Sequence, residues 1–212
     1  MSYLVNLNLK GRRAVVVGGG SVALRKVGGL LAAGARVTVV AESPHHEVRL
    51  LAAAGRLRLE ARPYADGDLE GAFLAVAATD DEEVNARVSA EAGRHGILVN
   101  VADRPALCTF TLPAVVRRGD LTLGVATDGR CPALSRALRE DLERAYGEEY
   151  GELTSLLGSL RDRLLTEDRP YEAVQRAIEA VYRGGALRLL AAGDREALRD
   201  LIWRACSLEW DK

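Results

Sequence analysis

Arg13-Ala14-Val15-Val16-Val17-Gly18-Gly19-Gly20-Ser21-Val22-Ala23 is the stretch that decides the fold. A β-branched run leads into the pattern G-x-G-x-x-A, and apolar residues at helical spacing follow it. This order of strand, glycine loop and helix is typical of a dinucleotide-binding turn. Gly18 permits the tight turn, Gly20 lets the backbone approach a pyrophosphate, and Ala23 allows close packing of the helix on the sheet. The sequence favours Gly18, Gly19 and Gly20 as cofactor-binding residues over a glycine-rich turn without a ligand.

The alternation of strand and helix signals continues through the first hundred residues. Short apolar or β-branched runs predict strands, and apolar residues at helical spacing predict the helices between them. The predicted strands are residues 13–17, 36–40, 57–60, 73–78 and 97–99, and the predicted helices are residues 21–33, 45–54 and 81–94. This order predicts an α/β domain with a parallel, doubly wound sheet of the Rossmann type.

The pattern changes after residue 103. Residues 109–116 and 121–126 resemble strands, and their short link Arg117-Arg118-Gly119-Asp120 predicts an antiparallel hairpin. Pro132 then opens a helix at its first position. We interpret its apolar stripe as a core face; the stripe consists of Leu134, Leu138, Leu142 and Ala145.

From residue 148 onward the chain reads as helical, with further apolar stripes at helical spacing. These stripes are Leu153, Leu156, Leu157, Leu160 and Leu164; Val174, Ile178 and Val181; and Leu198, Leu201 and Ile202. We therefore expect a nucleotide-binding domain over residues 1–112, a hairpin-plus-helix segment over 113–147 and a helical domain over 148–212.

Composition excludes several classes of function. The chain has 212 residues, of which 48% are hydrophobic and 28% charged, so it is long and apolar enough to fold. Its net charge of −1 argues against a dedicated nucleic-acid binder. Without a long apolar run or a signal-peptide pattern, we expect a cytoplasmic protein with no membrane partner. The three cysteines and three histidines show no metal-ligand spacing, so we expect no permanent metal site.

The ends of the second and fourth predicted strands supply further cofactor candidates, because ligands of open parallel sheets bind outside the carboxyl ends of the strands. Glu42, with Ser43 beside it, is the first acid after the second strand. Its carboxylate would accept a hydrogen bond from a ribose hydroxyl and repel a 2′-phosphate, which favours NAD over NADP; a solvated loop acid is the alternative. Thr79 could contact the nicotinamide side, although it also fits a simple helix cap.

Asp103 is the only acid in the loop after the fifth predicted strand. A carboxylate there could take a proton while hydride leaves, and a residue that only shapes the turn is the alternative. Several arginines are near in sequence and could bind an acidic substrate or form a solvated face. They are Arg104, Arg117, Arg118 and Arg130.

Five segments, in order, resemble the precorrin-2 dehydrogenase family, which includes the N-terminal module of siroheme synthases. Residues 18–26 resemble its GGGxVAxRK signature, and residues 77–81 resemble its AATDD. Residues 100–103 look like its NVxD, residues 110–121 are similar to its FxxP…RGxL hairpin, and residues 127–134 resemble its S/T-x-G-x-S-P-x-L. An ordered set of this kind is far more specific than one glycine loop.

The resemblance implies a function. Members oxidise precorrin-2 to sirohydrochlorin with NAD, on the route to siroheme, and some also insert iron as ferrochelatases. By position, Ser21, Val22, Glu42 and Ser43 would contact NAD, and Asp103 would be the catalytic carboxylate. The segment over residues 113–147 would make a homodimer.

The resemblance also bears on the substrate, a tetrapyrrole with several carboxylates. Thr127 stands where some members carry a phosphorylatable serine. Our candidate substrate-binding residues are Arg104, Arg118, Thr127 and Arg130. Two departures from the family pattern stand near them: Cys131 replaces a serine and weakens a helix cap, and Asp128 adds a negative charge.

Two other functions remain open. A non-enzymatic NAD-sensing regulatory module usually has a third glycine and a clear acid at the end of the second strand, where this chain has Ala23 and Val40-Ala41. A dehydrogenase for another substrate would carry a catalytic domain with a His or Lys proton donor, and the hairpin and helical tail argue against it.

Overall fold

The computed structural model describes residues 3–208, and its two compact units meet between Leu112 and Pro113. The strands are β1 (Arg13–Val17), β2 (Arg36–Val40), β3 (Arg58–Glu60), β4 (Leu74–Ala77), β5 (Leu98–Val101), β6 (Ala114–Arg118) and β7 (Leu121–Val125). The helices are α1 (Ser21–Ala32), α2 (His46–Ala53), α3 (Glu82–His95), the short η1 (Pro105–Leu107), α4 (Pro132–Ala145), α5 (Glu149–Thr166), α6 (Tyr171–Arg183), α7 (Ala186–Ala192) and α8 (Arg195–Cys206). Within residues 3–208, no helix is long and apolar enough to cross a membrane.

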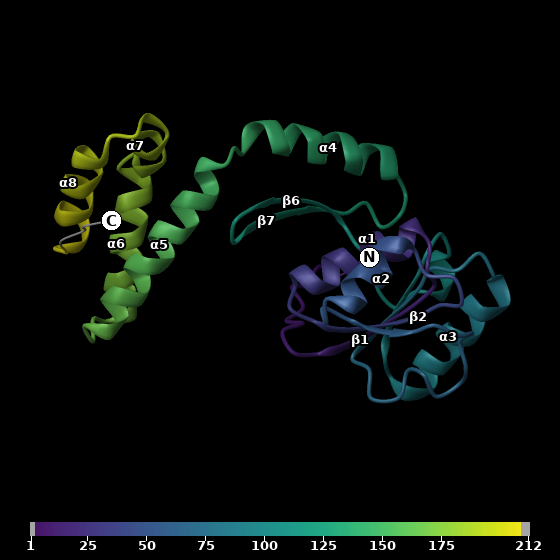
Figure 1. Cartoon of the computed structure of the whole chain (residues 1–212). Helices are drawn as coiled ribbons and strands as arrows, with labels where there is room; N and C mark the ends of the chain where they lie inside the picture. The colour runs from purple at the N-terminus through teal and green to yellow at the C-terminus, as the bar shows by residue number, and fades with distance from the viewer. Residues whose placement is uncertain (1–2, 209–212) are drawn as a thin grey trace. The chain divides into compact units, whose positions relative to one another are not determined.

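The first unit is a parallel five-stranded sheet in the order β3-β2-β1-β4-β5. Alternate residues of β1 enter two different cores: Val16 packs with residues of α1 and α2, and Val15 and Val17 pack with residues of α3. Helices therefore cover both faces of the sheet (Figure 1). Every residue of β4 is buried, as expected for a strand covered on both faces. The predicted doubly wound α/β fold is confirmed.

The hairpin of the second unit is shorter than predicted. β6 pairs antiparallel with β7 and the turn is Gly119-Asp120, so Arg117 and Arg118 belong to the strand rather than to the link. The prediction of a strand from residue 109 is also wrong, because Thr109 is bonded to β5 of the first unit. Its backbone N–H donates to the carbonyl of Val99 at 2.9 Å, and its hydroxyl accepts from the Val99 N–H at 2.8 Å.

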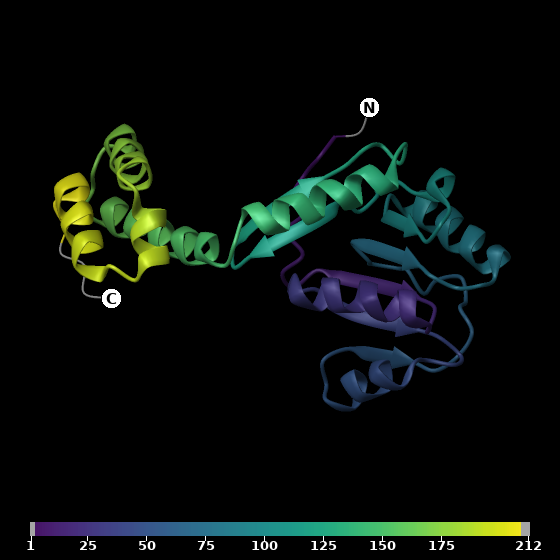
Figure 2. The same ribbon diagram turned by 90° about the horizontal axis from the view of Figure 1, so that it is seen from above.

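Helices α5 to α8 share one apolar core, which confirms the three predicted C-terminal stripes as core faces. The stripe of α4 is different. Leu134 and Leu138 are 48% and 40% exposed, and the buried residue of this helix is Ser135. Because α4 lies along the hairpin (Figure 2), its stripe is only partly covered within one chain. The interpretation of that stripe as a core face is therefore wrong for Leu134 and Leu138.

Candidate functional site

Four strands of the first unit end at the same level. The last residues of β1, β2, β4 and β5 are register partners in turn: Val17 with Val40, Val17 with Ala77, and Ala77 with Val101. The chain continues these ladders by one bond beyond the strands, from Gly18 N–H to Val40 and from Ala102 N–H to Ala77. The loops that follow therefore lie along one edge of the sheet, where open parallel sheets bind ligands.

The three glycines of the first loop have different surroundings. Gly18 has a φ of 120°, and a Cβ there would overlap the carbonyl oxygen of Ala78. A Cβ on Gly19 would lie 2.7 Å from the Cα of Pro44. A Cβ on Gly20 would meet nothing within 4 Å. Because Gly18 and Gly19 have no side chains, the loop after β1 can pack closely against the loops after β4 and β2. Gly20 leaves open space at the N-terminus of α1, which suits an anion.

The loop after β2 is joined to the glycine loop. The backbone N–H of His45 donates to the carbonyl of Gly19 at 2.7 Å. Glu42 and Ser43, which lie in the chain between β2 and His45, are exposed, whereas Pro44 is buried against Gly19. The structure therefore brings Glu42 and Ser43 to the same edge as Gly20, Ser21 and Val22.

The loop after β4 is a helix cap. Asp81 accepts from the backbone N–H groups of Glu83 and Val84 at 2.9 and 3.1 Å and caps α3. The Thr79 hydroxyl lies 3.0 Å from Oδ1 of Asn85, a buried residue of α3, and accepts from the Asp81 N–H at 3.2 Å. Thr79 stands at the site edge, and its hydroxyl is engaged locally. Asn85, for which the sequence pattern predicted no role, holds this loop.

Asp103 stands on the same edge, two residues after the end of β5. It is exposed, and its backbone has a φ of 56°, in the left-handed region. Residues other than glycine are uncommon there, although Asn and Asp tolerate it best. Such strain clusters at functional sites. Arg104 is also exposed, and its guanidinium pairs with Glu82 at the start of α3.

The side chain of Cys108 contacts the backbone of the loop that carries Asp103. Its sulfur accepts from the Val101 N–H at 3.1 Å and lies 3.3 Å from the carbonyl oxygens of both Val101 and Arg104. The thiol therefore holds the two ends of the turn that carries Asp103. Nothing in the sequence pattern indicated this role of Cys108.

Lys26 and Asn100, for which the sequence predicted no functional role, form a hydrogen bond near this loop. Lys26 of α1 donates to Oδ1 of Asn100 at 3.1 Å, and Asn100 is buried. Burial, and secondly the charge of Arg25, lower the pKa of Lys26; Cys108, and to a smaller extent Asp103, partly offset this decrease. The Asp103 carboxylate is therefore within electrostatic reach of a half-buried ammonium. One signal in the sequence could have identified these two residues: Lys26 lies in residues 18–26 and Asn100 in residues 100–103, two of the segments that resemble family motifs.

The remaining candidates lie in the second unit. Arg118 is almost buried: its Nε and Nη2 donate to the carbonyls of Tyr146 and Glu143 at the end of α4, at 2.8 and 3.0 Å. Since these bonds satisfy the last carbonyls of a helix, Arg118 has a structural role there. The Thr127 hydroxyl lies 3.0 Å from that of Ser135, and Arg130 is exposed.

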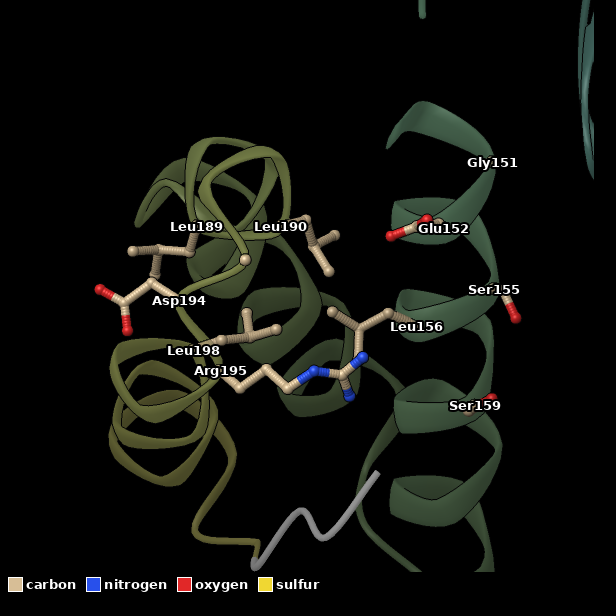
Figure 3. A pocket seen from close by; sticks show the side chains of 11 residues that line it. Gly151, Glu152, Ser155, Leu156, Ser159, Leu189, Leu190, Asp194, Arg195 and Leu198 are labelled. Atoms are coloured by element: carbon tan, nitrogen blue, oxygen red, sulfur yellow. The ribbon is translucent and has the colours of Figure 1, made fainter. Parts of the chain in front are cut away.

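A hollow of about 520 Å³ lies in the second unit, between α5 and the corner of α7 and α8. In Figure 3 Leu156, Leu190 and Leu198 point into it, and the Arg195 side chain extends across it toward α5. None of the predicted site residues lines this hollow. Within residues 3–208, no group of three or more His, Cys, Asp or Glu residues could hold a metal ion.

Residues 5–114 match the family described as "Putative NAD(P)-binding". The chain is 44% identical over 195 residues to the siroheme synthase of Pseudomonas paraeruginosa, covering 91% of this chain and 42% of that protein. It is 39% identical over 203 residues to siroheme synthase 1 of Cronobacter sakazakii, covering 95% of this chain and 43% of that one. The chain thus spans less than half the length of these relatives.

A solved structure matches nearly the full length of the chain. It is titled "SirC, precorrin-2 dehydrogenase", and the two structures superpose with a TM-score of 0.81 at 30% sequence identity. The match covers 98% of this chain and 100% of the other.

Proposed function

The chain belongs to the precorrin-2 dehydrogenase family of NAD(P)-binding proteins, and from that premise we propose that it oxidises precorrin-2 to sirohydrochlorin with NAD. One observation carries the proposal. The open space at Gly20 and Asp103, whose backbone is left-handed, lie on one edge of the sheet, beyond strands that end in register. A cofactor and a proton acceptor can thus meet at that edge.

The glycine loop fits a dinucleotide cofactor. The bare Gly20 and the N-terminus of α1 would hold a pyrophosphate, with Ser21 and Val22 beside it. Glu42 and Ser43 are exposed next to this loop and would take the ribose hydroxyls. Since a carboxylate at Glu42 repels a 2′-phosphate, we propose NAD rather than NADP. When bound, the nicotinamide accepts the hydride, and the protein supplies orientation and electrostatics.

Asp103 is the proposed base. Its carboxylate accepts the proton that the substrate releases as hydride leaves, and the Cys108 anchor and the Lys26–Asn100 bond hold its loop. Arg104, Thr127 and Arg130 are the proposed contacts to the carboxylates of the substrate. Arg118, whose Nε and Nη2 also donate to the carbonyls at the end of α4, stays in this set as a fourth proposed contact. The same carboxylate could take pyrrole protons during iron insertion.

We also propose that residues 113–147 form a homodimer interface. A two-stranded hairpin is marginal by itself, and among the described residues its main contacts are with α4 and with a few residues of α5. Leu134 and Leu138 remain exposed on α4. A second copy would cover both residues. Light scattering of the full chain should then give twice 22.8 kDa, and a monomer at low micromolar concentration would end this part of the proposal.

The activity is tested by mixing the chain with precorrin-2 and either NAD or NADP without air. The visible spectrum reports sirohydrochlorin, and added ferrous iron reports chelation in the same cuvette. We expect oxidation with NAD and a lower kcat/KM with NADP. Binding of NAD without any turnover would instead favour a sensing module.

A further inference from the structure

Arginines gather at the edge of the sheet opposite to the candidate site. A hollow of about 480 Å³ lies over the amino ends of β1, β2 and β3. Four arginines line it: Arg13, Arg36, Arg56 and Arg58. We name these four the arginine hollow. β1 begins at Arg13 and β2 at Arg36, whereas the glycine loop follows the other end of β1.

The strand register places these charges side by side. Arg13 and Arg36 are register partners on β1 and β2, and Arg58 is the partner of Thr38, two residues after Arg36. Since side chains of register partners share a face, three arginines of three neighbouring strands stand on one face of the sheet. Like charges at neighbouring positions destabilise a sheet, so this arrangement costs stability unless an anion offsets it.

Two of the guanidinium groups are held in place by backbone oxygens. Arg13 donates to the carbonyls of Asp68, at 3.0 Å, and Glu70. Arg36 donates through Nε to the carbonyl of Gly11 at 2.9 Å, so both of its Nη atoms remain for a ligand. These bonds fix the groups without neutralising them, because a carbonyl carries no net charge.

The charge of the hollow is compensated only in part. Arg58 pairs with Glu60 at 2.6 Å through Nε. Arg56 is exposed, and the structure over residues 3–208 gives its guanidinium no hydrogen bond or ion pair. Four cations thus line the hollow. The Glu60 carboxylate pairs with Arg58, and the Asp68 carboxylate interacts electrostatically with Arg13, but each of these carboxylates also pairs with Arg62.

We propose that the arginine hollow binds a compact polyanion, a small molecule with two or more carboxylate or phosphate groups. Guanidinium forks bind both groups in the same bidentate way. The site is separate from the proposed cofactor edge, so its ligand binds together with NAD. The proposal does not depend on the activity proposed above.

Calorimetric titration of the full chain with citrate or with pyrophosphate, at low salt and saturating NAD, tests the proposal. We expect saturable binding of one of the two probes at one site per chain. The double variant Arg36→Gln/Arg56→Gln should bind about tenfold more weakly or worse. The tighter probe identifies carboxylate or phosphate as the preferred group.

The matched control is Arg176→Gln/Arg199→Gln, which removes the same charge from exposed positions of α6 and α8. The affinity of this control for the probe should equal that of the wild type. An equal loss of affinity in both double variants would show that general charge attraction causes the binding, and it would overturn the proposal. No binding of either probe, or a loss only in Gly20→Asp, would also overturn it. If the first double variant fails to fold, Arg56→Gln alone, at an exposed and unpaired position, should still weaken binding several-fold.

Discussion

The ammonium of Lys26 on α1 donates to the side-chain oxygen of Asn100 on β5 at 3.1 Å, across 74 positions of sequence. The amide of Asn100 in turn donates to the carbonyl of Phe110 at 3.1 Å. Asp103 lies in the chain between Asn100 and Phe110. The first helix, the fifth strand and both ends of the loop that carries the proposed base are thus joined through one buried amide.

Lys26→Met should therefore misplace this loop. We expect kcat for precorrin-2 oxidation to fall tenfold to a hundredfold while the affinity for NAD is unchanged, because small displacements of a catalytic group are costly. Loss of the bond should cost about 1 kcal/mol of unfolding free energy. Stopped-flow turnover and NAD titration measure the two effects. Lys26→Arg, which keeps a donor and a charge, should recover most of the rate; a stability loss with normal kcat would refute the positioning role.

Substitutions at Gly20 and Gly18 should have different effects, the first on NAD binding and the second on stability. Gly20→Asp places a side chain into open space, so the fold should persist while the added negative charge removes NAD binding. Gly18→Ala should instead lower the unfolding temperature strongly, because of the overlap with Ala78 and the φ of 120°. Thermal unfolding and NAD titration of both variants distinguish these effects. Unchanged NAD affinity in Gly20→Asp would exclude the loop as the site.

Glu91 should be a large stability determinant of the first unit. It is 1% exposed and accepts from the N–H groups of Gly67 and Leu69, at 3.1 and 3.0 Å, and from the Tyr64 hydroxyl. Glu91→Leu leaves these donors buried without an acceptor and should cost about 3 kcal/mol. Glu91→Gln keeps one oxygen and should cost less. Urea unfolding measures both, and equal stability of the Leu variant and the wild type would contradict the account.

Low pH should remove the stability that the Arg62–Asp68 pair contributes in the loop between β3 and β4. Asp68 accepts from both Nη atoms of Arg62, at 2.6 and 2.8 Å, and this pairing lowers the pKa of Asp68. A lowered carboxyl pKa gives stability above the unfolded value of about 4, and this stability is lost as pH falls through the folded value. Asp68→Asn should thus be less stable than the wild type at pH 7, and the difference should shrink below about pH 4. A difference independent of pH would assign the effect to packing.

The sheet was predictable because its signals are local. Five apolar runs and one glycine loop fix the strands, and the parallel order follows from the helices between them. The start of β6 was not predictable, because Thr109 has the composition of a strand residue and only its bonds to Val99 assign it to the first unit.

The site was predictable in outline only. Glu42, Thr79 and Asp103 follow strand ends, and position along the chain is enough to place them on one edge. The left-handed backbone of Asp103 and the Lys26–Asn100 bond depend on contacts distant in sequence. Likewise, an apolar stripe does not reveal what will cover it, so Leu134 and Leu138 appeared to be core residues.

Turnover of Asp103→Asn tests the central claim most directly. Asparagine keeps the preference for the left-handed backbone and the shape of the side chain, so only the charge is removed. With precorrin-2 and NAD, we predict a rate of sirohydrochlorin formation at least a hundredfold below that of the wild type, at equal unfolding temperature and equal NAD affinity. A variant that oxidises precorrin-2 at the wild-type rate would contradict the assignment of Asp103 as the base.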